Sequence, residues 1–168
     1  MEGETTLAWL SQQEQDIWRV MVAVHTRLVA RMDAELISRH GISLRDYEVL
    51  VQLSEADEAK LRMAELAERL FVSPSGLTRR LDGLVRSGYV KRQVCLSDRR
   101  GMLAVLSTSG WEIMRQAAPT HLASVRRYVF DPLEGRQLYQ LSETLRAMSG
   151  ALEPDTRPRA ANNQGSAG

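Results

Sequence analysis

The chain contains almost no cysteine and no long apolar run. Cys95 is the single cysteine among 168 residues, so no disulfide can form within the chain, and one thiol suits a reducing compartment. No stretch of about 18 apolar residues is available to cross a bilayer, and the first residues lack the basic-then-apolar pattern of a secretion signal. We therefore expect a cytoplasmic protein that has no membrane partner.

The sequence patterns of enzymes and metal proteins are also missing. There is no Ser–His–Asp arrangement, no glycine-rich phosphate loop and no pair of carboxylates in a recognisable motif. The three histidines are scattered, without the paired spacing of a metal site. We predict that the protein is not an enzyme and holds neither a metal nor a cofactor.

Charge, by contrast, is present and unevenly distributed. The net charge is only +1, but residues 60–101 contain ten Lys or Arg and four Asp or Glu, which gives this segment +6 and the rest of the chain −5. A basic middle between acidic flanks favours a polyanion as the partner of the middle segment. The alternative is a solvated surface on which charges cluster by chance.

Apolar spacing predicts a long first helix over residues 11–40, which Gly41 ends. One stripe of this helix is apolar: Ile17, Met21, Val24, Leu28, Met32 and Leu36. A stripe of this length cannot be covered by one short neighbour in so small a chain. We therefore expect this helix to pack against a second subunit.

Shorter elements follow in the middle of the chain. Ser43 and Asp46 form a near capping box for a helix that ends near residue 55, and residues 61–63 and 64–70 suit a short extended piece and a third helix. Alternation in residues 89–96, a polar turn and a second apolar run at 102–106 predict a β-hairpin with a basic tip. Two helices complete the chain, one from Ser107 or Thr108 to about residue 130 with a bend near Pro119, the other over 133–152.

Residues 73–88 predict a helix with an unusual outer face. Ser73 is its N-cap, Pro74 occupies the first helical position, and Gly88 ends it; its buried stripe comprises Leu77, Leu81, Leu84 and Val85. Arg79 falls opposite this stripe, flanked by small residues that permit close approach to a large partner. Arginine can donate two hydrogen bonds to guanine, and Ser73 and Ser75 with the free amides of the first turn can hold a phosphate.

The order of elements supports DNA binding. The helix at 64–70, a tight turn and the helix at 73–88 form a helix-turn-helix, and the hairpin that carries Arg99 and Arg100 forms a wing whose tip can enter a minor groove. Each piece alone has a simpler explanation as a solvated helix face or a charged hairpin. Their succession within the segment of charge +6 favours DNA as the partner.

The residues 63–110 contain MAELAERLFVSPSGLTRRLDGLVRSGYVKR and SDRRGMLAVLSTSG. This stretch resembles the winged helix-turn-helix of the multiple antibiotic resistance regulator (MarR) family. Asp98-Arg99-Arg100 is similar to the family's Asp-x-Arg wing signature, and Leu106-Ser107 stands where the family usually has Leu-Thr. The resemblance covers roughly residues 12–152.

The resemblance implies a mainly α fold with a small β-hairpin wing (α+β). Its parts would be an arm and first dimerisation helix (1–42), a winged helix-turn-helix DNA-binding lobe (43–107), C-terminal dimerisation helices (108–152) and a disordered tail (153–168). It also implies a homodimer that represses genes. Two-fold symmetry predicts a pseudo-palindromic operator with half-sites about one helical turn apart.

The resemblance assigns roles to individual residues. Ser75, Thr78, Arg79 and Arg80 would contact the major groove, Arg100 would enter the minor groove, and Asp98 would orient the wing arginine. Together with the reasoning from the residues, the predicted DNA contacts are Ser73, Ser75, Gly76, Thr78, Arg79, Arg80, Arg99 and Arg100, with Asp98 as wing support.

Family members commonly release DNA when a small aromatic or phenolic ligand binds between the dimer helices and the DNA-binding lobe. The candidate effector residues here are Trp18, His25, Tyr47 and His121, for which core packing or plain surface exposure is the alternative. Cys95 lies on the hairpin, away from the first helix in which family members carry sensing cysteines. Two other functions stay open: a DNA-binding dimer without an effector, and a winged-helix module that binds a protein.

Three positions depart from the family pattern. Gly83 replaces a common arginine and so removes one possible phosphate or wing contact, while Ser107 replaces a threonine that caps a helix equally well. Phe71 stands where many helix-turn-helix proteins have glycine. We therefore expect a turn built without a left-handed residue.

Overall fold

The structure is a computed structural model that describes residues 9–95 and 101–152. The chain divides into two compact units, Met1–Val129 and Phe130–Gly168, and each is described by itself. None of the helices in the described ranges is long and apolar enough to cross a membrane. The predicted disordered tail, 153–168, and the predicted wing tip, 98–100, lie outside the described residues.

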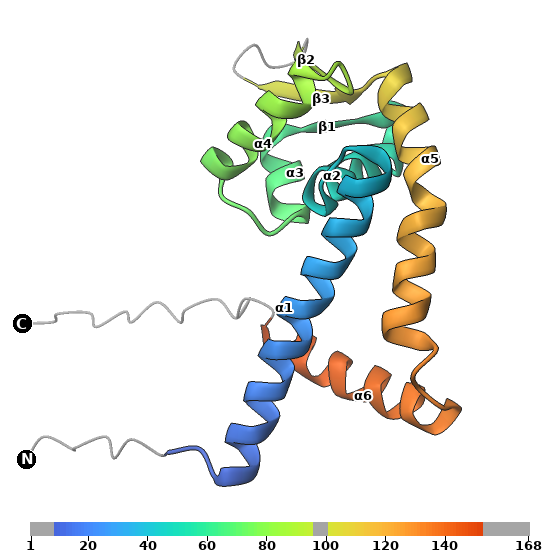
Figure 1. The fold of residues 1–168 in the computed structure, drawn as a ribbon. Coiled ribbons are helices and arrows are strands. Elements are labelled where there is room, and N and C mark those ends of the chain that lie inside the picture. Colours follow the sequence, from blue (N-terminus) through green and yellow to red (C-terminus); the bar gives the residue numbers. More distant parts are fainter. Residues whose placement is uncertain (1–8, 96–100, 153–168) are drawn as a thin grey trace, which may run out of the picture. The chain divides into compact units, whose positions relative to one another are not determined.

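The first unit is mainly helical with a small sheet, as predicted (Figure 1). Its larger elements are α1 (Gln12–His40), α2 (Leu44–Ser54), β1 (Lys60–Arg62), α3 (Met63–Arg69), α4 (Pro74–Arg86), β2 (Val90–Val94), β3 (Met102–Leu106) and α5 (Thr108–Val125). A 3₁₀ turn at Asp57–Ala59 precedes β1, and a π-helical turn at Arg126–Phe130 extends α5.

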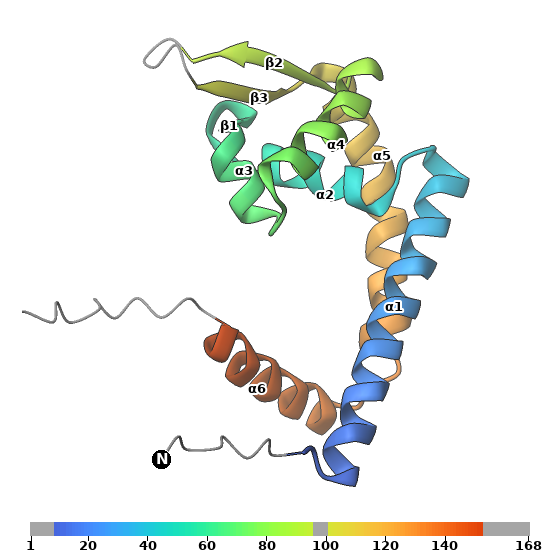
Figure 2. The same cartoon turned by 90° about the vertical axis from the view of Figure 1, so that its left-hand side faces the viewer.

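The sheet has three antiparallel strands in the order β1-β3-β2. Strands β2 and β3 are the predicted hairpin, with Val90 paired to Leu106 and Val94 to Met102. The short extended piece predicted near residue 61 is β1, which pairs along the other edge of β3 (Figure 2). The sheet therefore ties the start of α3 to the hairpin that follows α4.

The core of this unit lies under the helix-turn-helix. Leu50 and Leu53 of α2, Leu66 of α3 and Leu77 and Leu81 of α4 are each completely buried. Burying a leucine side chain stabilises a fold by about 1.5–3 kcal/mol relative to leaving it exposed. The leucine stripe predicted for residues 73–88 thus fixes α4 against α2 and α3.

Serine caps begin four of the described helices, α1 among them. The hydroxyls of Ser43, Ser73 and Ser107 accept backbone N–H bonds of 3.0, 3.1 and 3.0 Å at the starts of α2, α4 and α5. Gly110, in the first turn of α5, is required by a close approach, because a Cβ atom there would lie 2.2 Å from the Tyr89 carbonyl oxygen. The end of the α4–β2 connection is therefore packed directly against the start of α5.

The turn between α3 and α4 contradicts the prediction that it has no left-handed residue. Phe71 has φ = 52° and its side chain is 96% exposed. The Phe71 N–H donates to Glu68 O and the Val72 N–H to Ala67 O, both at 3.0 Å. This pattern of bonds is the Schellman ending of a helix, which demands a left-handed residue whatever its side chain. The prediction was wrong because the turn's geometry, rather than the presence of a glycine, sets the backbone.

Helix α1 changes character along its length. Ser11 and Glu14 form a capping box at its start, and Gly41 ends it at φ = 69°. Near its C-terminal end Met32 and Leu36 are buried, whereas Ile17, near its N-terminal end, is 60% exposed. Only the second half of the predicted apolar stripe is covered within this unit.

Helices α1 and α5 lie side by side and share a polar contact (Figures 1 and 2). The Glu35 carboxylate accepts hydrogen bonds from the hydroxyls of Ser124 and Tyr128, the latter at 2.6 Å. Tyr128 belongs to the π-helical turn, and α5 continues through Pro119 to reach it. The prediction that this helix extends to about residue 130 is confirmed.

In the second unit the structure describes α6 (Gly135–Leu152), which begins two residues after the predicted start. The Gln137 side chain accepts a hydrogen bond of 2.8 Å from the Glu134 N–H at its beginning. Apolar side chains along it are exposed, among them Tyr139, Leu145 and Leu152.

Candidate nucleic-acid interface

Helix α4 has one buried face and one exposed face. Leu77, Leu81 and Leu84 are buried, whereas Ser75 and Arg79 on the opposite side are exposed. Because the exposed side chains near Arg79 are small, a partner can approach the helix backbone closely. The outward face that the sequence predicted is therefore available to a partner.

The first turn of α4 is held by its own side chains. Ser73 Oγ accepts from the Gly76 N–H and lies 3.3 Å from Ser75 Oγ, and the Thr78 hydroxyl donates to Pro74 O at 2.9 Å. Ser73 therefore serves as the cap that orients this turn. Ser75 and Thr78 remain exposed at the surface.

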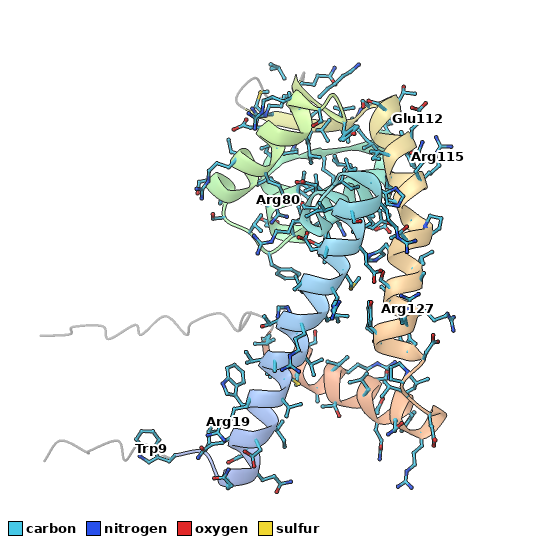
Figure 3. The ribbon with its side chains drawn as sticks, viewed as in Figure 1. Trp9, Arg19, Arg80, Glu112, Arg115 and Arg127 are labelled. Carbon is cyan, nitrogen blue, oxygen red and sulfur yellow. The ribbon has the colours of Figure 1, made fainter. Side chains whose placement is uncertain are left out.

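Two neighbouring arginines on α4 have different surroundings. Arg80 is half-buried beside α2, where its Nη1 atom lies 3.5 Å from the Arg45 carbonyl oxygen (Figure 3). Arg79 is exposed and has no hydrogen bond or ion pair within the described part of the chain. The Arg79 guanidinium thus keeps all its donors for a partner.

A hollow of about 580 Å³ opens beside these arginines. The N-terminal ends of α2 and α4 meet there, and both carry the partial positive charge of unpaired backbone N–H groups. Three guanidinium groups and one carboxylate line it, within the set Ser43, Arg45, Asp46, Val72, Ser73, Gly76, Arg79 and Arg80. Its positive charge suits an anion such as a phosphate.

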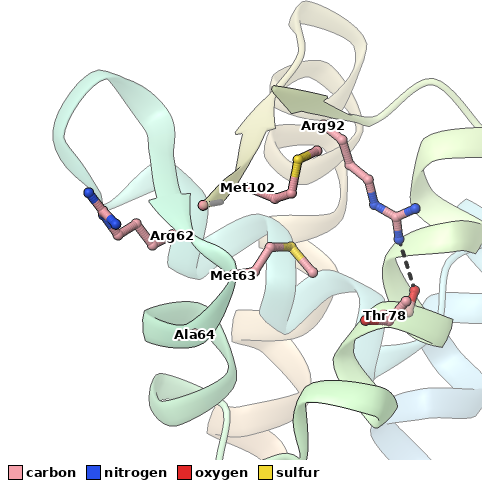
Figure 4. Close-up of a pocket in the computed structure, with 7 residues that line it drawn as sticks. Arg62, Met63, Ala64, Thr78, Arg92 and Met102 are labelled. Carbon is pink, nitrogen blue, oxygen red and sulfur yellow. Dashed lines mark hydrogen bonds between the residues drawn. The ribbon is translucent and has the colours of Figure 1, made fainter. Parts of the chain in front are cut away.

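Strand β2 is attached to α4 by Arg92, which the sequence reasoning did not single out. Its Nη2 atom lies 2.8 Å from Asp82 Oδ1. The same atom donates to the Thr78 carbonyl oxygen at 3.1 Å (Figure 4). A groove of about 520 Å³ runs beside this contact, with Met63 and Met102 on its walls. The opposite charges of Asp82 and Arg92 were visible in the sequence, but their proximity was not.

The predicted wing residues Asp98, Arg99 and Arg100 lie outside the described residues. At the base of the hairpin, the Cys95 N–H donates to Gly101 O at 2.9 Å. Cys95 is buried, and Arg62 Nη2 lies 3.6 Å from its sulfur.

Of the four predicted effector residues, the structure brings two together. The rings of Tyr47 on α2 and His121 on α5 are 4.8 Å apart at their centres. They line a hollow of about 310 Å³ together with Glu48, Val51, Gln52, Arg69, Leu70 and Phe71. Burial lowers the pKa of His121 and raises the pKa of Tyr47, so both side chains are neutral near pH 7. His121 Nδ1 is buried and has no partner among the described atoms.

The other two candidates lie elsewhere. Trp18 is 56% exposed on the N-terminal half of α1, and His25 lines a separate hollow with Asp33 and Arg45. Within the described ranges, no three His, Cys, Asp or Glu side chains are placed to hold a metal ion.

Comparison with known proteins agrees with this architecture. The profile of the MarR family matches residues 40–101. The transcriptional repressor YetL of Bacillus subtilis is 33% identical over 85 residues, a match that spans 51% of this chain and only 51% of YetL. The uncharacterised regulator YfiV of the same organism is 29% identical over 86% of this chain and 88% of its own length.

Solved structures extend the likeness to nearly the whole chain. Sco3205, a MarR family regulator from Streptomyces coelicolor that was crystallised with DNA, is 35% identical with a TM-score of 0.85 and covers 90% of this chain and 95% of its own. AbsC, from the same organism and family, is 37% identical with a TM-score of 0.81 over 87% and 98% of the two chains. With identity above one third over nearly complete relatives, the chain belongs to the MarR family of transcriptional regulators.

Proposed function

We propose that this regulator binds double-stranded DNA as a homodimer, with α4 as its recognition helix. The exposed face of α4 carries the proposal: Arg79 stands there with free donors among small side chains, on a helix that buried leucines hold in place. Arginine bonded to guanine O6 and N7 reads sequence in the major groove. The hollow between α2 and α4 supplies the positive surroundings for a backbone phosphate.

A second copy accounts for the exposed apolar side chains of α1. Ile17, Val20 and Val24 are each more than half exposed within the chain. A stripe of this kind on a monomer would leave apolar area in water that a second copy can cover. The resulting two-fold symmetry suits a pseudo-palindromic operator, in which one α4 reads each half-site and Arg100 of each wing enters the minor groove.

The regulatory role proposed is repression that a small aromatic or phenolic ligand relieves. The hollow at Tyr47 and His121 supports this role, because it joins two neutral rings, an unpartnered buried nitrogen and the turn at Phe71. A ligand hydroxyl could donate to His121 Nδ1. The site lies between α2, α5 and the turn that precedes α4, so a ligand there touches the support of the recognition helix.

The proposal is tested by fluorescence anisotropy with DNA from upstream of the protein's own gene, against a scrambled duplex of equal length. We expect preference for the upstream duplex and an affinity that falls as salt rises, because phosphate contacts release counterions. Addition of salicylate as an aromatic probe should release the DNA from wild type and not from the His121→Ala variant. Specific DNA binding would be rejected by two results together: equal affinity for the two duplexes, and no sequence enriched in a genome-wide selection.

Arg79 provides the residue-level test. Arg79→Ala should weaken operator binding by about 1–3 kcal/mol and relax preference at one base position, since a bidentate arginine contributes that much discrimination. Arg115→Ala, which removes a cation from the outer surface of α5, is the matched control and should leave affinity unchanged (Figure 3). Equal loss on every sequence would instead assign Arg79 to a phosphate.

Two alternatives make different predictions. A DNA-binding dimer without an effector would show the same operator preference but no release by any aromatic compound. A winged helix that binds a protein would bind neither duplex. Arg79→Ala would then leave the affinity for DNA unchanged at every salt concentration.

A further inference from the structure

In the described residues, an ion pair joins strand β2 to helix α4: Arg92 lies on the strand and Asp82 on the helix. Arg92 Nη2 lies 2.8 Å from Asp82 Oδ1. The same nitrogen donates to the Thr78 carbonyl oxygen at 3.1 Å (Figure 4), so it contacts two residues that lie one turn apart on α4. The Arg92 side chain is 31% exposed and that of Asp82 is 49% exposed. The contact is thus reachable by solvent but fixed at three atoms.

Within the described residues, little else fixes this side of the hairpin. Gly83, the residue beside Asp82, carries no side chain, and the space around it is open. Beyond Val90, all four remaining residues of β2 are exposed. The outer part of β2 therefore depends on its pairing with β3 and on Arg92 for its position relative to α4.

We propose that Asp82 and Arg92 are positioning residues, which hold the wing at the angle to α4 that lets both bind one operator half-site. This inference rests on the proposed DNA-binding function. Asp82 need not contact DNA in this role; it acts by directing Arg92. Because the guanidinium is held through both a carboxylate and a helix carbonyl, neither a lysine nor a solvent-facing arginine would fix the strand in the same way.

The negative charge of Asp82 distinguishes a positioning role from a simple effect of charge on DNA binding. A carboxylate on a DNA-facing helix repels phosphates, so simple electrostatics predicts that Asp82→Asn tightens binding. A positioning role predicts the opposite sign. Asn has nearly the same size as Asp, and the side chain is half exposed, so the variant is expected to fold.

The experiment measures operator affinity for wild type, Asp82→Asn, Arg92→Gln and the double variant. Asp82→Asn should weaken binding by about three- to ten-fold, the range expected for a charge-assisted contact at the surface. In the Arg92→Gln background the same substitution should cause no further loss. Unchanged or tighter binding by Asp82→Asn would overturn the proposal.

Glu65→Gln is the matched control, because it also removes one carboxylate from the lobe and breaks an ion pair, with Arg69 at 2.7 Å on α3. It should not weaken binding. If Glu65→Gln and Asp82→Asn lose affinity equally, the effect belongs to general charge or stability, and the positioning role is rejected.

Hydrogen exchange of the free protein separates this inference from the proposed function. Amides of β2 should exchange faster in Asp82→Asn than in wild type, while those of α2 stay unchanged, whether or not DNA binds. Faster exchange together with absent operator binding in wild type would reject the DNA-binding function and retain the contact's role in placing the strand. Unchanged exchange of β2 would reject the positioning role even if wild type binds DNA tightly.

Discussion

Replacing Phe71 with glycine is expected to stabilise the protein, although it removes a large apolar side chain. Phe71 holds φ = 52° at the Schellman ending of α3. The left-handed conformation costs a residue with a Cβ atom about 1–2 kcal/mol. Glycine avoids this cost but adds about 0.5–1 kcal/mol of chain entropy to the unfolded state. The difference is a net stabilisation of about 0.5–1 kcal/mol.

The side chain itself contributes almost nothing to this difference. Full burial of a phenylalanine stabilises a fold by about 1.5–3 kcal/mol, but the Phe71 ring is 96% exposed, so little of this is lost on its removal. Both hydrogen bonds of the turn use backbone atoms and survive the substitution. The backbone conformation therefore decides the sign.

Urea and thermal unfolding of wild type, Phe71→Gly and Phe71→Ala measure the effect. The alanine variant removes the ring and keeps the left-handed strain, so its stability should match that of wild type within about 0.5 kcal/mol. The midpoint of thermal unfolding of the glycine variant should be about 1–4 °C higher than that of wild type, as the predicted stabilisation implies for a chain of this size. A glycine variant no more stable than the alanine variant would refute the assignment of strain to Phe71.

Two further substitutions test the helices themselves. Gly83→Ala should stabilise the protein by about 0.5–1 kcal/mol, since alanine favours a helix interior and its Cβ would meet no atom within 4 Å. Urea unfolding measures this change, and a loss of stability would contradict the open space around Gly83. Hydrogen bonds from Ser124 and Tyr128, aided by Arg127 and Arg39, hold the pKa of Glu35 below its usual 4.5. A carboxyl whose pKa is lowered by folding stabilises above pH 4.5 and loses this effect as pH falls through the folded-state pKa. Wild type should therefore be more stable than Glu35→Gln at pH 7, and the difference in their free energies of unfolding should shrink as the pH is lowered. A difference that does not depend on pH would show that the charge of the carboxylate is not its cause.

Helix α4 was predictable because its information is local. Ser73 caps it, Pro74 fits its first position and Leu77, Leu81 and Leu84 recur at helical spacing, and each of these features acts within one or two turns. The same holds for α1 between Ser11 and Gly41. Segments that carry their own start, stop and buried face need no knowledge of their neighbours.

The contacts between elements were not predictable in this way. The positive φ of Phe71 follows from how the chain must leave α3 to start α4. A phenylalanine side chain does not predict this backbone conformation. Tyr47 and His121 meet only because α5 returns to α2, and Asp82 meets Arg92 only because β2 runs back along α4. Trp18 and His25, chosen for the same effector role, lie on α1 and do not line this hollow. Residue type alone does not specify which face of a long helix lines a cavity.

Helix α1 joins the proposed dimer to the proposed DNA contact. Its C-terminal end is buried with the lobe through Met32 and Leu36, and its N-terminal half exposes apolar side chains that a second copy would cover. The Glu35 carboxylate joins this helix to Ser124 of α5 and to Tyr128 in the π-helical turn that follows α5. Under the proposed function, a ligand in the hollow at Tyr47 and His121 would lie against α2, α5 and the turn that precedes α4, so its binding would act on the support of α4. In the proposed dimer, the spacing of the two α4 helices would follow from how the first helices of the two copies pair, and we expect operator affinity to depend on that spacing.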